Sequence, residues 1–119
     1  MLNGAMTERV ARRFRALSEP MRLRILQALE SGEKPVNDIV ALLESSQPNI
    51  SRHLKALCQE GLLERRRKGL KVCYSIADPM VFRLCDLICR SVTEQTRSQL
   101  AELDAISGNS RRTGHRARR

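Results

Sequence analysis

Aromatic side chains are scarce in this 119-residue sequence, which has no tryptophan, one tyrosine and two phenylalanines. Proteins that bind single-stranded nucleic acids stack bases on aromatic rings, and this chain has too few rings to form such a platform. Histidine is scarce too, since only His53 and His115 are present, and no nucleophile stands beside a base and an orienting group. The composition therefore favours duplex over single-strand binding and argues against an enzyme.

The sequence also lacks a long apolar segment. No run approaches the roughly 18 apolar residues that cross a membrane, and the first residues contain no apolar signal-peptide core. We therefore expect a cytoplasmic protein without a membrane partner. In that compartment the four cysteines are expected to be thiols rather than a disulfide framework. They are Cys58, Cys73, Cys85 and Cys89.

Acidic residues are outnumbered, and the formal net charge is +9. Residues 107–119 hold five arginines and no acid, so residues 1–106 keep 17 basic residues against 13 acidic ones, a net charge of +4. The remaining cations gather at residues 9–15, at Arg52 and Lys55, and at residues 65–68. This patchy distribution favours a polyanionic partner over a merely solvated surface. A chain of this size also gains core from a second copy, so we expect an oligomer.

Hydrophobic spacing predicts four helices in the first half of the chain. Apolar residues recur at helical intervals in residues 7–17, 20–31 and 35–43, and again after Ser46. Ser46 is a typical helix cap, and Pro48 fits the first turn that follows it. Only Glu44 and Ser45 separate the third and fourth helices, so the two are expected to form a helix-turn-helix.

After Gly61 the pattern changes from helical to alternating. Residues 62–66 and 71–76 predict a β-hairpin with a basic tip at Gly69, and Asp78-Pro79 starts a long last helix that ends near Ile106. The expected fold is therefore mainly α with a small β-hairpin, a winged helix-turn-helix in the order α-α-α-α-β-β-α.

We expect one folded domain over residues 7–106. It would be preceded by a loose N-terminus of residues 1–6 and followed by a disordered basic tail of residues 107–119.

The helix that begins after Ser46 has two distinct sides. Ile50, Leu54 and Leu57 fall on one stripe, and the opposite side carries no carboxylate before Glu60. Amide and guanidinium groups can contact base edges, while Ser and Lys favour phosphates. We predict DNA contacts from Ser46, Gln47, Asn49, Ser51, Arg52, His53 and Lys55. For His53, which flanks the apolar stripe, a hydrogen bond that locks the helix is an equal alternative.

The hairpin tip carries a second set of cations. Long basic side chains at such a tip can follow phosphates or enter an adjacent minor groove. The predicted contacts here are Arg66, Arg67, Lys68 and Lys71.

Three segments resemble the ArsR/SmtB family of bacterial repressors. They are residues 17–26 (LSEPMRLRIL), residues 46–57 (SQPNISRHLKAL), and residues 61–76 with Gly61-Leu62-Leu63, the Lys-Gly turn and Tyr74-Ser75-Ile76. The resemblance implies a homodimer whose first and last helices form the interface. It further implies a repressor that binds double-stranded operator DNA and leaves it when an inducer binds.

Members of that family differ in the residues that sense the inducer. The Cys-x-Cys metal pair that many members carry in the helix of residues 35–43 is missing here, and no histidine follows Asp78 in the last helix. Instead, Cys85 and Cys89 lie four residues apart on that helix, at the predicted dimer seam. Residues at this spacing have Cβ atoms about 5 to 6 Å apart, too far for an unstrained disulfide. A bridging atom between the two thiols fits the spacing better.

By family resemblance, As(III) or Sb(III) held by three thiolates is the first hypothesis, with Cys73 as the candidate third ligand. Zinc or cadmium held by four thiolates across the dimer comes next, followed closely by persulfide or redox sensing. One alternative is a regulator without an inducer, in which the cysteines are packing residues. Another is a winged helix that binds a protein. Cys58 is interpreted as a half-buried residue without a ligand role.

Overall fold

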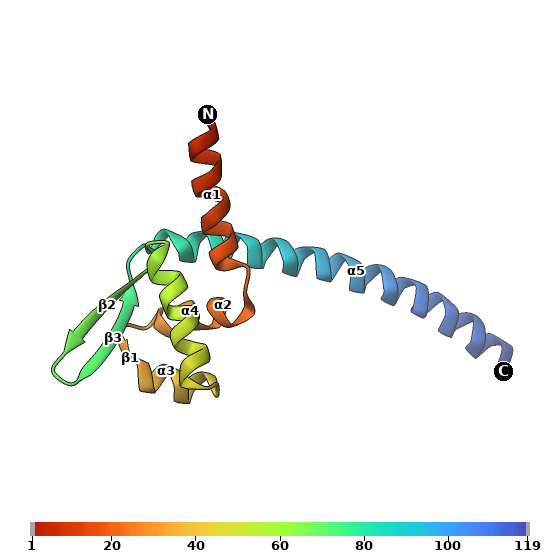
Figure 1. The fold of residues 1–119 in the computed structure, drawn as a ribbon. Helices are drawn as coiled ribbons and strands as arrows, with labels where there is room; N and C mark the ends of the chain where they lie inside the picture. The colour runs from red at the N-terminus through yellow and green to blue at the C-terminus, as the bar shows by residue number, and fades with distance from the viewer. Residues whose placement is uncertain (1, 119) are drawn as a thin grey trace. The chain divides into compact units, whose positions relative to one another are not determined.

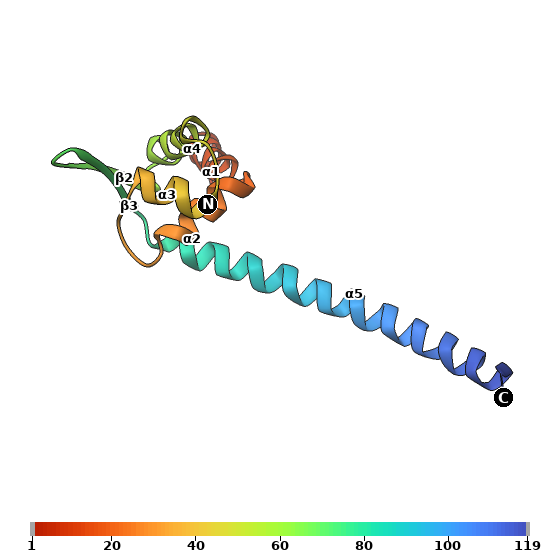
Figure 2. The ribbon, with the colours of Figure 1, turned by 90° about the horizontal axis from the view of Figure 1, so that it is seen from below.

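The computed structural model describes residues 2–118, and the side chains of residues 2–108. The chain forms two compact units, of which one ends at Pro79 and the other begins at Met80. We call the first the winged-helix unit, because it contains four helices and a three-stranded sheet (Figure 1). The second unit is a single helix (Figure 2).

The four helices of the winged-helix unit surround one apolar core. They are α1 (Gly4–Leu17), α2 (Pro20–Leu29), α3 (Val36–Leu43) and α4 (Gln47–Gln59). Helices α2, α3 and α4 bury residues of the apolar stripes that their sequence spacing predicts, and the fully buried side chains include Ile25, Ile39 and Ile50. Helix α1 buries only its last turn, because Leu17 is buried whereas Phe14 is 52% exposed. Burial of one such side chain stabilises a fold by about 1.5 to 3 kcal/mol. The helix-turn-helix of α3 and α4 is confirmed.

The sheet contains one strand more than the predicted hairpin. Strands β2 (Leu63–Lys68) and β3 (Lys71–Ile76) form the antiparallel wing, and Gly69 adopts a φ of 63° in the turn between them. The added strand is β1 (Lys34–Pro35), which pairs with β3 so that the order is β1-β3-β2. The third helix therefore starts at Val36 rather than at Pro35. Pro35 is extended, with a ψ of 153°, and a proline is tolerated in an edge strand such as this one.

The first helix starts earlier than predicted. Asn3 caps α1, because its side-chain oxygen accepts a hydrogen bond from the backbone N of Met6 at 2.8 Å. Residues 4–6, which were expected to be loose, are therefore helical. Asparagine is among the preferred N-cap residues, so the sequence contained this signal.

The second unit is α5 (Met80–Arg118), which continues past Ile106, where the sequence predicts its end. The side chains of residues 109–119 lie outside the described part of the chain, so the predicted disorder of the basic tail stays a prediction. None of the helices among the described residues has an apolar stretch long enough to cross a membrane.

Candidate nucleic-acid interface

Helix α4 begins with an exposed and well-capped first turn. The Ser46 hydroxyl accepts a hydrogen bond from the backbone N of Asn49 at 3.3 Å, and Pro48 occupies the first turn. A serine cap stabilises a helix by about 1 kcal/mol relative to alanine. Ser46 and Gln47 are both exposed. The helix therefore starts where the sequence predicts it, with polar groups at the surface from its first residue.

The two sides of α4 differ as the sequence spacing indicates. Ile50, Leu54 and Leu57 are each 0 % exposed and attach the helix to the core. On the other side Arg52 and Lys55 are exposed, whereas Asn49 and Ser51 are half-buried. The structure thus brings most of the predicted contact residues to one accessible surface.

Asn49 is held by two neighbours on this surface. Its amide nitrogen donates to the hydroxyl of Ser45 at 2.9 Å, and its amide oxygen accepts from Nη2 of Arg52 at 2.9 Å. These bonds fix the orientation of the amide and of one end of the guanidinium. The two side chains are therefore oriented before any partner binds. Such fixed geometry is what a paired contact to a base edge requires.

His53 does not belong to the exposed surface. It is 4 % exposed, and its Nδ1 accepts a hydrogen bond from Nε of Arg22 at 3.1 Å. Burial, with further contributions from the Arg52 and Arg22 cations, lowers the pKa of His53 below its ordinary value. The neutral ring therefore links α2 to α4. Of the two roles predicted for His53, its burial and its contact support the hydrogen bond that locks the helix rather than a DNA contact.

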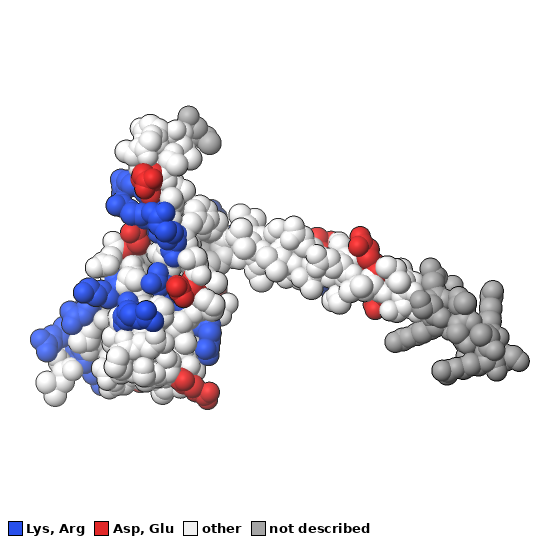
Figure 3. Space-filling model, turned by 45° about the vertical axis from the view of Figure 1, so that its right-hand side comes forward, with Lys and Arg blue, Asp and Glu red and all other residues white. Residues whose placement is uncertain are grey.

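The wing presents its cations to solvent. Arg66, Arg67, Lys68 and Lys71 are all exposed. Lys68 and Lys71 face each other across the last register pair of the hairpin. Lys and Arg side chains are also spread over a wide face of the winged-helix unit, interrupted by acidic residues (Figure 3). The predicted basic tip is therefore present.

Two of the wing cations are paired with one acid. Glu33, which precedes β1, lies 2.5 Å from Nζ of Lys68 and 3.5 Å from Nε of Arg66. The hydrogen bond from Lys68, together with the charges of Arg66 and Lys68, holds the pKa of Glu33 below its ordinary value. No local sequence signal points to Glu33, because it lies 33 positions before Arg66 in the chain. Among the described residues of the wing, Arg65, Arg67 and Lys71 form no ion pair.

The cysteines differ in exposure. In the winged-helix unit Cys73 is buried on β3 and Cys58 is half-buried, as expected for the latter. On α5 Cys85 is half-buried and Cys89 is exposed. Burial raises the pKa of the thiols of Cys58 and Cys85, so both are protonated at neutral pH.

No three metal-ligating side chains of His, Cys, Asp or Glu come together among the described residues of this single chain. Cys85 and Cys89 lie one helical turn apart on α5 and make a pair only. A site with three or four thiolates would therefore need groups beyond this pair, such as those of a second chain.

The capped α4, the turn from α3 and the basic wing define a winged helix-turn-helix, as the sequence predicts. Residues 19–65 match the family described as bacterial regulatory protein, arsR family. The chain belongs to this ArsR family, and the relatives and solved structures below agree with that assignment.

The chain is 42% identical over 78 residues to a probable mercury resistance operon repressor of Streptomyces lividans. That match covers 66% of this chain and 60% of the relative, so the chain spans about three fifths of its length. The first of two similar solved structures is a homodimeric winged helix-turn-helix DNA-binding domain of Mycobacterium bovis, a possible ArsR-family regulator. It has a TM-score of 0.70, 34% identity, and coverage of 79% of this chain and 92% of that one.

The second similar structure is that of the AntR antimony-specific transcriptional repressor. It has a TM-score of 0.70 and 30% identity, and the match covers 82% of this chain and 88% of that one. None of these three descriptions is that of an enzyme.

Proposed function

We propose that this chain is a transcriptional repressor that binds a specific double-stranded DNA operator as a homodimer in the cytoplasm. The observation that carries the proposal is the accessible side of α4, which presents the oriented Asn49–Arg52 pair together with the exposed Gln47 and Lys55. No carboxylate occurs between Gln47 and Gln59. Such a surface can read base edges in a major groove without repelling phosphates.

The wing supplies the sequence-independent part of the contact. Its exposed cations, Arg66, Arg67, Lys68 and Lys71, suit the phosphate backbone beside the groove that α4 enters. The salt slope of binding is the steepness with which the logarithm of affinity falls with the logarithm of salt concentration. Loss of one phosphate contact lowers this slope by about one unit and changes sequence preference little.

The dimer is supported by apolar residues on α5 that the single chain leaves exposed. Ile88 and Val92 are each 55% exposed and lie one turn apart, and Cys85 lies on the same stripe. A second copy of the chain would cover this stripe. The similar structure from Mycobacterium bovis is described as homodimeric, which agrees with this assembly.

The DNA-binding proposal is tested by selecting duplexes from a randomised pool and measuring their affinity as a function of salt. We expect enrichment of a palindromic sequence with a steep salt dependence. Arg52→Ala and Asn49→Ala should each abolish the preference. Arg24→Ala, which removes an exposed cation from α2, is the matched control. Equal affinity for all duplexes would overturn the proposal of a sequence-specific repressor. A lack of DNA binding would favour a winged helix that binds a protein.

We further propose that Cys85 and Cys89 sense a thiophilic inducer, with arsenite or antimonite first and another soft metal ion next. The pair lies on one helix at i and i+4, and Cys89 is exposed to an incoming ion. The descriptions of two similar proteins name mercury resistance and antimony. Two copies of the pair in a dimer would supply four thiols, and Cys73 is the alternative third ligand. Persulfide or redox sensing by the same pair is the second candidate.

The inducer is tested by adding arsenite, antimonite, cadmium or a polysulfide to the protein bound to its selected duplex. We expect release by one of them, and loss of that release in Cys85→Ser and in Cys89→Ser. Cys58→Ser is the matched control and should respond normally. Because Cd²⁺ displaces the thiol protons, release by cadmium should strengthen as pH rises. Indifference to all four reagents would leave a repressor without an inducer.

A further inference from the structure

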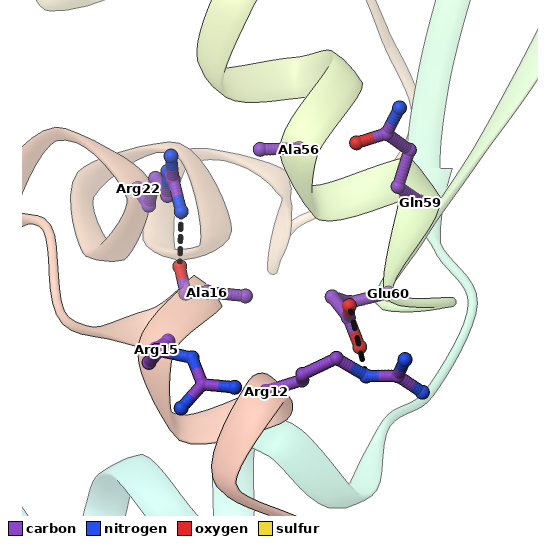
Figure 4. Close-up of a pocket in the computed structure, with 7 residues that line it drawn as sticks. All are labelled: Arg12, Arg15, Ala16, Arg22, Ala56, Gln59 and Glu60. Carbon is purple, nitrogen blue, oxygen red and sulfur yellow. Dashed lines mark hydrogen bonds and ion pairs between the residues drawn. The ribbon is translucent and has the colours of Figure 1, made fainter. Parts of the chain in front are cut away.

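A second group of basic residues forms a pocket between α1, α2 and α4, inside the winged-helix unit. Its volume is about 210 Å³, and Arg12, Arg15, Arg22, Gln59 and Glu60 contribute its polar groups. Figure 4 shows the three arginines around the opening, with Gln59 and Glu60 coming from the end of α4. The proposed DNA surface at the start of α4 uses none of these residues.

The arginines of this pocket are weakly neutralised. Nε of Arg12 lies 3.9 Å from the Glu60 carboxylate, and Nη2 of Arg15 lies 4.0 Å from that of Glu8. Both distances exceed that of a hydrogen bond, and pairs as exposed as these contribute little. With three guanidinium groups and one carboxylate, the pocket carries a formal charge of +2.

Arg22 is the fixed member of the group. It is half-buried, its Nε donates to Nδ1 of His53 and its Nη1 donates to the carbonyl oxygen of Ala16 at 3.3 Å. Both acceptors are neutral, and Arg22 forms no ion pair with any described residue. Its third nitrogen, Nη2, donates to none of the described residues. A half-buried cation with a free donor is costly unless an anion compensates it.

We propose that this pocket binds a phosphate group. A guanidinium matches both carboxylate and phosphate with parallel hydrogen bonds, but a carboxylate has two oxygens and one charge. Three guanidinium groups around one pocket offer more donors than a carboxylate can accept, and a charge of +2 matches a phosphate dianion. The volume lies below the range of roughly 300 to 1,000 Å³ that is typical for drug-sized ligands, so it suits a phosphate or a small phosphorylated compound.

The phosphate has two conceivable sources, a small molecule or the DNA backbone. The second source rests on the proposed DNA binding, and the first does not. In either case the ligand contacts Arg22, which also bonds His53 in the middle of α4. A phosphate in the pocket would therefore contact a side chain that is hydrogen-bonded to α4, the helix that carries the proposed recognition surface.

The site is tested first on the protein alone, by titration with inorganic phosphate followed by NMR of the arginine Nε–Hε groups at constant ionic strength. We expect saturable shifts centred on Arg22, and weaker shifts with acetate. Arg12→Gln combined with Arg15→Gln should weaken phosphate binding by at least about tenfold. Both side chains are exposed, so the fold tolerates these changes.

The matched control is Arg9→Gln combined with Arg24→Gln. It removes one exposed cation from α1 and one from α2, both outside the pocket. Its phosphate affinity should stay within about twofold of the parent protein, because general charge attraction is screened by salt. Equal weakening in the two double variants, or shifts that do not saturate, would overturn the proposal.

Measurements of duplex binding distinguish the two sources of the phosphate. A small phosphorylated ligand predicts that Arg12→Gln with Arg15→Gln leaves the salt slope unchanged and that phosphate also binds the protein–DNA complex. A backbone phosphate predicts a slope lower by up to about two units and displacement of phosphate by the duplex. Both results support a phosphate site. If the protein binds no DNA, the titration of the protein alone still decides the proposal.

Discussion

The Glu33 carboxylate lies 2.5 Å from Nζ of Lys68, and the same carboxylate lies 3.5 Å from Nε of Arg66. An acid that precedes β1 thus holds two of the five cations of the wing. Phosphates that approach this strand must compete with Glu33. The wing of the free protein is therefore less basic than its sequence suggests.

Glu33→Gln should strengthen duplex binding. The substitution frees Lys68 and Arg66 for phosphates, so we expect affinity to rise several-fold and the salt slope to steepen by up to about two units. Glu64→Gln, which neutralises an acid of β2 that has no ion pair among the described residues, is the control. Fluorescence anisotropy at several salt concentrations measures both quantities. Identical slopes for Glu33→Gln and the parent protein would show that Glu33 does not compete.

Arg67→Ala should lower the salt slope of duplex binding by about one unit, because Arg67 is exposed and has no ion pair with any described residue. Arg66→Ala should lower the slope less. When Arg66 leaves Glu33 for a phosphate, Glu33 attracts a cation from solution, and this uptake offsets part of the counterion release from the DNA. The same anisotropy titration compares the two variants. A larger change of slope for Arg66→Ala would contradict this ranking of the wing cations.

His53→Asn should reduce the pH dependence of stability between pH 7 and pH 5. The pKa of His53 is lowered in the folded chain, so the unfolded chain binds the proton more readily. The contribution of His53 to the free energy of unfolding is therefore complete above the ordinary pKa of about 6.5 and is lost as pH falls below it. The asparagine keeps an acceptor for Arg22 but does not titrate.

Urea unfolding of both proteins at pH 7, 6 and 5 measures the effect. The parent protein should lose stability more steeply than His53→Asn as the pH falls. Equal losses in the two proteins would mean that His53 is not the titrating group.

Arg13→Ala should destabilise the winged-helix unit by about 1 to 3 kcal/mol. Its Nη1 donates to Asp78 at 2.8 Å, and its Nη2 donates to the backbone carbonyl of Glu60 at 2.8 Å. These bonds connect α1 to the end of α4 and to the segment after β3. Chemical unfolding compares the variant with Arg9→Ala, which removes an exposed cation of the same helix and should change stability by less than about 0.5 kcal/mol. Equal effects would contradict the role of Arg13.

The helices and the wing of this protein follow from the sequence alone, because these features depend on local patterns. The cap at Ser46, the apolar stripe of Ile50, Leu54 and Leu57, and the turn at Gly69 each involve residues a few positions apart. The same local patterns predicted the exposed side of α4 and the ArsR family. They missed β1, because a two-residue strand has no periodicity of its own and forms only by pairing with β3.

Which polar residues are free to contact a partner depends on how distant segments pack in the folded chain. His53 and Arg22 are 31 positions apart, and their hydrogen bond removes His53 from the surface. Through packing of distant segments, Glu33 reaches the wing, and three arginines from two helices line one pocket beside the end of α4. The sequence shows which side chains carry charge or can form hydrogen bonds. The fold brings each of them to its partner.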